Sequence, residues 1–192
     1  MAVFRRHGFN RMIIAMSVSL HTQITHDGSL FKVEVISWTD QQGRRLTREI
    51  VRHPGAVMVV PLLDNGRFVM IRNERIAVDE VLWELPAGKL EPGEDPAHAA
   101  SRELEEETGY RAATMERLGE FYTSPGFADE LMHVYVARDL VSHTQRLEPG
   151  ERITVELVET LQAKKMIREG VIRDGKTIAG LLMHLSSQEE IH

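Results

Sequence analysis

The sequence predicts an α+β protein, in which a mixed β-sheet is covered by helices and follows a small antiparallel β-hairpin subdomain. Three observations support this class. Strand-like segments outnumber helical ones, two of the strands are continuously apolar and suit a sheet covered on both faces, and one helix is clearly delimited at both ends. The 192 residues, 42% hydrophobic and 27% charged, indicate one globular domain with a small accessory piece.

Residues 1–28 are expected to form a disordered or partly ordered N-terminal tail. An apolar run at 12–20 follows basic residues, as in a targeting segment, but it is short and no small-residue cleavage site follows it. Translation that begins at Met12 or Met16 would also explain the run. No other stretch approaches the roughly 18 apolar residues that cross a bilayer, so we expect a cytoplasmic protein without a membrane partner.

The N-terminal β subdomain is expected at residues 29–53 and consists of two strands. Residues 31–38 and 46–53 are rich in β-branched and aromatic side chains, and a turn that contains Gly43 lies between them. A two-stranded ribbon is only marginally stable alone, so this hairpin should pack against another surface. Its arginines are either ordinary solvent-exposed strand residues or contacts to a phosphate that is bound at a neighbouring subunit.

The remaining residues, 54–192, form the expected main domain. Its elements follow from apolar runs, from a turn at Asn65-Gly66 and from helical spacing of apolar residues. The expected strands are residues 56–63, 67–72, 118–123, 131–137 and 153–158, and the expected helices are residues 95–108, 159–169 and 177–185. No internal repeat or low-complexity linker interrupts this part of the chain, which supports a single domain.

The charge and the cysteine content exclude several classes of function. The net charge of −6, from 23 Lys and Arg against 29 Asp and Glu, provides no global positive field for a long nucleic acid. Any bound phosphate must therefore be recognised locally or through a metal ion. The absence of cysteine excludes disulfides, thiolate nucleophiles, cysteine-bound zinc and iron–sulfur clusters, and it fits a reducing compartment.

One predicted helix carries an unusual arrangement of carboxylates. Asp95 is its N-cap and Gly109 its left-handed stop. Glu103, Glu106 and Glu107 share one face near its C-terminal end, where mutual repulsion and the helix dipole both disfavour negative charge. A hard divalent cation such as Mg²⁺ or Mn²⁺ would reverse this effect, because it prefers carboxylate oxygens. A solvated acidic face is the alternative interpretation.

The spacing of these residues favours the cation site. Gly88 is followed by five residues and Glu94, then by seven residues and the run from Arg102 to Tyr110, which reads RELEEETGY. This pattern resembles the Nudix box, in which G, five residues, E, seven residues and REUXEEXGU occur in order and U is apolar. Leu104 and Tyr110 fill the two U positions. The chain is therefore identified as a member of the Nudix hydrolases, whose fold is an α/β/α sandwich with a mixed sheet.

Three further segments resemble the ADP-ribose pyrophosphatase-like subfamily. ELPAG at 84–88 leads into the box, SPGFADE at 124–130 contains a proline sixteen residues after Gly109, and IRDGKT at 172–177 is similar to I-x-D-x-K-T. The resemblance implies a homodimer that hydrolyses ADP-ribose to AMP and ribose 5-phosphate with Mg²⁺. The alternatives are hydrolysis of other nucleoside diphosphate sugars, such as ADP- or GDP-sugars, and a non-catalytic nucleotide-sensing module.

The resemblance also implies roles around the metal ion, for which Mn²⁺ is a substitute. The expected ligands are one backbone carbonyl and three carboxylates: Ala87, Glu103, Glu106 and Glu107. Glu103 and Glu107 form the best pair, because they lie one turn apart on one face. Arg102 is expected to hold the acidic array in orientation, and Glu94 is a further candidate ligand.

The resemblance also implies which residues bind the substrate and which residue acts as the general base. The expected substrate-binding residues are Arg75 for the phosphates, Phe31 for the base, and Arg52 and Pro125. Glu130 matches the position proposed for the general base in this family, with Asp129 and Glu106 as alternatives. Exposed charge is the alternative interpretation for Arg75 and Glu130, because charged residues are mostly exposed.

Overall fold

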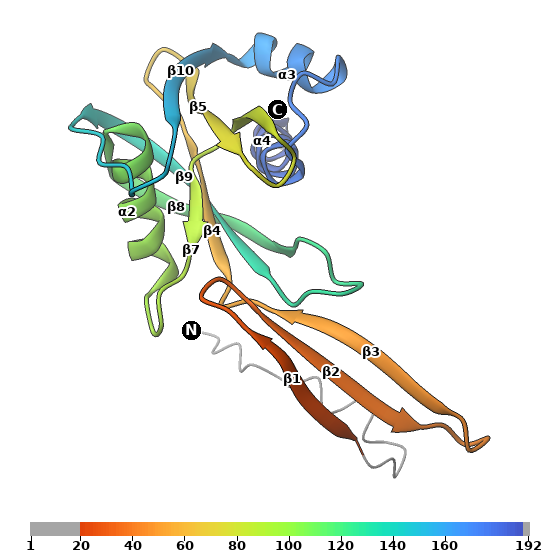
Figure 1. Cartoon of the computed structure of the whole chain (residues 1–192). Coiled ribbons are helices and arrows are strands. Elements are labelled where there is room, and N and C mark those ends of the chain that lie inside the picture. Colours follow the sequence, from red (N-terminus) through yellow and green to blue (C-terminus); the bar gives the residue numbers. More distant parts are fainter. Residues whose placement is uncertain (1–19, 190–192) are drawn as a thin grey trace, which may run out of the picture. The chain divides into compact units, whose positions relative to one another are not determined.

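The computed structural model describes residues 20–189 (Figure 1) and divides the chain into two compact units. Among the described residues, one unit comprises residues 20–53 together with Gly126–Asp129, and the other comprises Pro54–Pro125 and residues 130–189. Most of the expected N-terminal tail, including the alternative start sites and all of the apolar run except Leu20, lies outside the described residues. None of the helices within residues 20–189 is long and apolar enough to cross a membrane.

The first unit is a three-stranded antiparallel sheet in the order β1-β2-β3. Its strands are β1 (His21–Asp27), β2 (Lys32–Thr39) and β3 (Arg45–Arg52). Gly126–Asp129 attaches to the end of β3, because the Val51 N–H donates to the Phe127 carbonyl at 2.8 Å and the Asp129 N–H donates to the Val51 carbonyl at 3.1 Å. This unit therefore combines the N-terminal strands with a short segment from much later in the sequence.

Strand β1 differs from the prediction, which placed these residues in a tail. Every residue of β1 is exposed, so the strand has no hydrophobic face that the sequence pattern could reveal. It forms by pairing with β2, with an irregular register between Ile24 and His26. The predicted two-stranded hairpin is thus a three-stranded sheet in which β2 is central.

The second unit contains two sheets and the helices that cover them. Its strands are β4 (Ala56–Pro61), β5 (Arg67–Arg75), β6 (Glu80–Glu84), β7 (Ala87–Lys89), β8 (Tyr110–Tyr122), β9 (Leu131–Ser142) and β10 (Ile153–Glu159), and its helices are α2 (Pro96–Thr108), α3 (Thr160–Arg168) and α4 (Gly175–Glu189). The strand orders are β7-β4-β9-β8 and β10-β5-β6. Strands β4 and β9 are parallel and their other neighbours antiparallel, so the sheet is mixed, as predicted.

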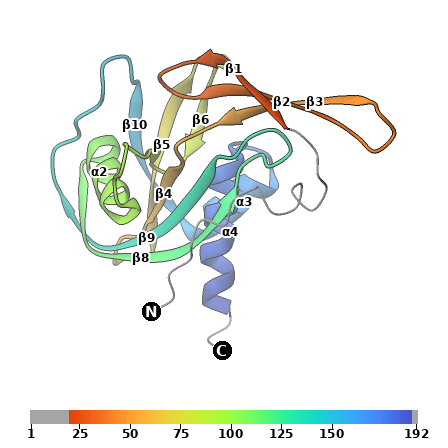
Figure 2. The ribbon, with the colours of Figure 1, turned by 90° about the horizontal axis from the view of Figure 1, so that it is seen from below.

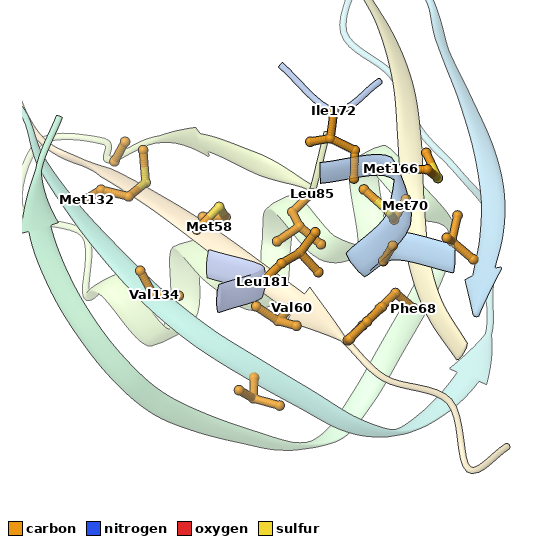
Figure 3. Close-up of a cluster of buried hydrophobic side chains, with 14 residues drawn as sticks. Met58, Val60, Phe68, Met70, Leu85, Met132, Val134, Met166, Ile172 and Leu181 are labelled. Atoms are coloured by element: carbon orange, nitrogen blue, oxygen red, sulfur yellow. The ribbon is translucent and has the colours of Figure 1, made fainter. Parts of the chain in front are cut away.

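Apolar side chains cover both faces of β4, which explains its continuously apolar sequence. Met58 and Val60 lie in a cluster with Leu181 of α4 (Figure 3). Val57 points to the opposite face and lies in a second cluster with Leu104 of α2. Helix α2 and helices α3 and α4 consequently lie on opposite sides of this sheet (Figure 2). The predicted α/β/α arrangement is confirmed.

Candidate active site

Helix α2 carries the acidic residues, and local hydrogen bonds fix both of its ends. The Asp95 side chain accepts hydrogen bonds from two backbone N–H groups of the first turn, at 2.9 and 3.3 Å, and Pro96 begins the helix. At the other end, Gly109 adopts a φ of 68° and its N–H donates to the Glu105 carbonyl. The predicted limits of this helix are confirmed.

The short strand β7 lies against the acidic face of α2. The Ala87 N–H donates to Oε2 of Glu107 at 2.8 Å. A Cβ at Gly88 would overlap the carboxylate of Glu103, so a side chain there would displace that carboxylate from its position. The structure thus brings Ala87 of β7 together with Glu103 and Glu107 of α2.

Arg102 binds three carboxylates at once. Its Nε and Nη2 donate to Glu94 at 3.0 and 3.1 Å, and its Nη1 donates to Glu103 at 2.7 Å and to Glu106 at 3.1 Å. The bonds to Glu94 and the neighbouring carboxylates raise the pKa of Arg102, and the same contact lowers the pKa of Glu94. Glu94 therefore anchors Arg102, and Arg102 orients the carboxylates beside it.

Burial raises the pKa values of two of the clustered carboxylates, Glu103 and Glu107. Glu107 is 4% exposed, and burial raises its pKa to about 8. The negative charges of Glu103 and Glu151 also raise this pKa, whereas the hydrogen bond from the Ala87 N–H and the charge of Arg75 lower it. Burial also raises the pKa of Glu103, against the opposing effect of Arg102. Buried carboxylates in this state favour a bound cation, and their oxygen donors fit a hard ion such as Mg²⁺.

The acidic residues of helix α2 are not arranged around a metal ion in this structure. Within residues 20–189, no three His, Asp or Glu side chains are arranged so that they could hold a metal ion. The hydrogen bonds from Arg102 occupy oxygens of Glu103 and Glu106, and Oε2 of Glu107 accepts the Ala87 N–H. Binding of a cation to this set of oxygens therefore requires a local rearrangement of side chains.

Comparison with known proteins identifies the family. The NUDIX domain family matches residues 52–181, which contain the whole acidic cluster. The chain belongs to the Nudix family. The ADP-ribose pyrophosphatase of Bacillus subtilis (strain 168) is 43% identical over 151 residues, which cover 78% of this chain and 81% of that protein.

Two further comparisons extend over more of this Nudix chain. The methanol dehydrogenase activator of Bacillus methanolicus is 42% identical over 175 residues, which cover 90% of this chain and 94% of that protein. A crystal structure described as an ADP compounds hydrolase shares the fold, with a TM-score of 0.79 and 20% sequence identity. The match covers 91% of this chain and 96% of that chain.

Arg75 of the Nudix domain lies at the end of β5, where its charge acts on Glu107. Its Nε and Nη2 each donate to Glu84 at 2.7 Å, and Lys176 lies 2.5 Å from the same carboxylate. Sequence analysis singled out Arg75 but missed Glu84 and Lys176. Both lie in segments that resemble the subfamily, ELPAG and IRDGKT, and that resemblance was the available signal.

Glu151 is a third residue that sequence analysis missed. It lies just before β10, and its charge contributes to the raised pKa values of Glu103 and Glu107. The same loop is attached to the end of α2, because the Arg146 N–H donates to the Glu106 carbonyl at 2.9 Å. No local pattern marks Glu151, since its proximity to the Nudix box arises from tertiary structure.

Glu130 and Pro125 lie at the two ends of the segment that attaches to the first unit. Thr123 donates through its hydroxyl to Oε2 of Glu130 at 2.6 Å and through its N–H to the Glu130 carbonyl at 3.2 Å. These bonds join the end of β8 to the start of β9, so Glu130 has a structural role there. Pro125 is exposed.

Phe31, Arg52 and Asp129 belong to the first unit. Arg52 donates to Glu34 at 2.6 Å and to Asp129 at 3.0 Å, and the other oxygen of Asp129 accepts the His53 N–H at 2.9 Å. Arg52 and Asp129 therefore fix Gly126–Asp129 to the end of β3. The side chain of Phe31 is 37% exposed.

Proposed function

We propose that this Nudix protein hydrolyses ADP-ribose to AMP and ribose 5-phosphate with Mg²⁺, for which Mn²⁺ can substitute. The observation that carries the proposal is the buried pair Glu103 and Glu107, whose raised pKa values favour a bound cation. The 43% identity to an ADP-ribose pyrophosphatase supports this substrate. Hydrolysis of other ADP- or GDP-sugars is the alternative, and a nucleotide-sensing module without turnover is less favoured because the acidic cluster is intact.

The proposed ligands are the Ala87 carbonyl and the carboxylates of Glu103, Glu106 and Glu107. A cation held there would neutralise charge on the pyrophosphate and lower the pKa of an attacking water. Arg102 keeps the carboxylates oriented through its hydrogen bonds, and Glu94 anchors Arg102. The remaining proposed contacts are to the phosphates and the nucleoside: Arg75, Phe31, Arg52 and Pro125.

We place the general base at Glu151 and keep Glu130, the residue favoured by the sequence, as its competitor. A general base must come within hydrogen-bond reach of the attacking water. Glu151 is supported because its charge reaches both Glu103 and Glu107. The two alternatives from the sequence are less favoured, since each is paired with an arginine, Asp129 with Arg52 and Glu106 with Arg102, whereas Oε2 of Glu151 accepts a backbone N–H, that of Glu148, at 2.7 Å.

The reaction is tested by incubation of the full chain with ADP-ribose, ADP-glucose and GDP-mannose in ¹⁸O-labelled water. We expect AMP and ribose 5-phosphate from ADP-ribose with Mg²⁺ or Mn²⁺, the label in one of the two products, and no turnover in excess chelator. Full turnover in chelator would contradict the role of the acidic cluster. A preference for GDP-mannose over ADP-ribose would establish the alternative substrate.

The base is tested by Glu151→Gln and Glu130→Gln, with Glu156→Gln on the exposed part of β10 as the matched control. Removal of a general base lowers kcat by roughly 10²–10⁴-fold, and we expect this loss for Glu151→Gln with little change in KM. The Glu156→Gln control should retain full activity. A loss confined to Glu130→Gln would move the base to Glu130.

We further propose a cytoplasmic homodimer with a nucleotide-sugar substrate and without a nucleic-acid or membrane partner. The net charge of −6 supports the absence of a long nucleic-acid partner, and the absence of cysteine fits a reducing compartment. The N-terminal β subdomain is the proposed dimer element. Localisation of a tagged full-length chain in its own cells tests the compartment.

A further inference from the structure

The segment IRDGKT fixes the start of α4 to the end of β6. Oδ2 of Asp174 accepts the Thr177 N–H at 2.9 Å and lies 3.0 Å from Nζ of Lys176. The Thr177 hydroxyl is fully buried and accepts the Leu85 N–H at 2.8 Å. Lys176 is therefore held in a defined position beside Glu84, the residue that precedes Leu85.

Glu84 is a buried carboxylate shared by two cations. It is 1% exposed; its Oε1 accepts Nε of Arg75, and its Oε2 accepts both Nη2 of Arg75 and Nζ of Lys176, at 2.7 and 2.5 Å. Burial alone would raise the pKa of Glu84, but the hydrogen bonds from Arg75 and the charge of Lys176 outweigh it and lower the pKa. Glu84 thus stays ionised and serves as a fixed anchor for both cations.

Arg75 uses one edge of its guanidinium group for this anchor. Nε and Nη2 are bound to Glu84, whereas Nη1 makes no hydrogen bond within the described part of the chain. The side chain is 41% exposed, so its outer edge is accessible to a ligand. Two N–H groups in a fixed plane suit a phosphate oxygen, and the value of such a contact depends on how well the plane is fixed.

We propose that Lys176 is a positioning residue for Arg75. Lys176 acts through the shared carboxylate of Glu84, which fixes Arg75 so that its outer edge meets a phosphate of the substrate. Lys176 donates to Oε2 of Glu84, the oxygen that also accepts Nη2 of Arg75, and supplies a second positive charge. The single negative charge of Glu84 is therefore shared between two cations, and three hydrogen bonds hold its carboxylate in place. This inference rests on the proposed hydrolysis for its kinetic test only.

The kinetic test is a double-mutant cycle with Arg75→Ala and Lys176→Met, measured on ADP-ribose with Mg²⁺. We expect Lys176→Met to lower kcat/KM by about tenfold, within the range for a misplaced contact, and Lys176→Arg to restore most of it. In the Arg75→Ala background, Lys176→Met should cause no further loss. Losses that simply add would show that Lys176 acts independently of Arg75 and would overturn the inference.

A second measurement separates this inference from the proposed function, because it needs no substrate. The Nε–H resonance of Arg75, assigned by its loss in Arg75→Lys, should be protected from exchange in the unaltered chain and less protected in Lys176→Met. Lys165→Met, at an exposed position of α3, is the matched control, and thermal unfolding checks that each variant is folded. Equal protection in Lys176→Met and the unaltered chain would overturn the inference even if ADP-ribose is hydrolysed. Failure to hydrolyse ADP-ribose, with the exchange difference present, would reject only the proposed function.

Discussion

Glu107 is a residue at which folding and function impose opposite requirements. Its side chain is 4% exposed and accepts the Ala87 N–H, yet burial keeps its pKa far above the ordinary value. A neutral side chain of the same shape would suit the fold better, because a buried charge without a close cation is destabilising. The carboxylate is therefore better explained by the proposed binding of a cation than by its contribution to stability.

Glu107→Gln should separate these two requirements. We expect kcat on ADP-ribose to fall by more than the roughly 10–100-fold seen for groups that only support a metal ligand. The melting temperature of the metal-free chain should stay the same or rise, since the amide oxygen can still accept the Ala87 N–H. Calorimetric unfolding and steady-state kinetics check both effects, and an active Glu107→Gln enzyme would place the metal elsewhere.

The raised pKa of Glu107 also predicts how stability depends on pH. Between its ordinary value near 4.5 and about 8, the folded chain retains a proton on Glu107 that the unfolded chain has released. The free energy of unfolding of the metal-free chain should therefore decrease as pH rises through this range, and Glu103 acts in the same direction. Urea unfolding in chelator at several pH values should show a shallower decline in Glu107→Gln. Parallel curves for the two chains would contradict this prediction.

At the scale of elements, the loop between β9 and β10 closes the C-terminal end of α2. The His143 N–H donates to the Gly109 carbonyl at 2.6 Å, and the Gln145 side chain donates to the Glu107 carbonyl at 2.7 Å. Nη2 of Arg146 in the loop donates to Oε1 of Glu105 in the helix at 2.8 Å. These bonds satisfy carbonyls that every helix end leaves unpaired, and they hold Glu151 near the acidic face.

Gln145→Ala tests this attachment. We expect it to lower the free energy of unfolding by about 1 kcal/mol, as for the loss of one hydrogen bond, and to lower kcat because Glu151 is less well held. Gln162→Ala, at an exposed position of α3, is the control. Unchanged kinetics together with the loss of stability would indicate that the loop does not position a catalytic group.

The elements with a strong hydrophobic or capping signal could be predicted from the sequence. Helix α2 carries both end signals, and β4 has a continuous apolar pattern. Strand β7 has only three residues and is defined by its pairing with β4, so it carries no periodicity of its own. Strand β8 begins at Tyr110 and not at 118, because its first residues are held by pairing with β9 more than by apolar character.

The candidate site could be predicted only where it is local in the sequence. Glu103, Glu106 and Glu107 share a helix face, and helical spacing alone reveals that. Glu84, Lys176 and Glu151 approach the site from separate elements, so their part in it follows from tertiary structure. No local pattern indicates that Arg102 pairs with Glu94 as well as with the carboxylates of its own helix, because Glu94 lies in the loop before the helix.

At the scale of the whole molecule, the first unit has too little apolar contact to explain its own stability. All of β1 is exposed, and Ile24, Leu30 and Phe31 expose 47%, 52% and 37% of their surface. A small sheet with exposed apolar side chains is marginally stable alone and gains from a covering surface. This observation supports the proposed homodimer through the N-terminal strands.

Sedimentation of the full chain should therefore show a particle of about twice the 21.8 kDa of one chain. Leu30→Asp should weaken this assembly, because it places a charge in the apolar contact. Leu161→Asp, at an exposed position of α3 far along the chain, is the control. A fully active monomer at working concentration would contradict the proposal.

The parallel pairing of β4 with β9 has a consequence for how the chain folds as it is synthesised. Ala56 pairs with Met132, and Met58 is covered by Leu181 of α4, so the partners of β4 leave the ribosome long after β4 itself. Contacts between residues so distant in sequence form slowly, and a strand that awaits them presents an apolar edge to other chains. The nascent chain therefore passes through a state that can aggregate until α4 has emerged, and protection during that interval, more than the final stability, should set the yield of native protein.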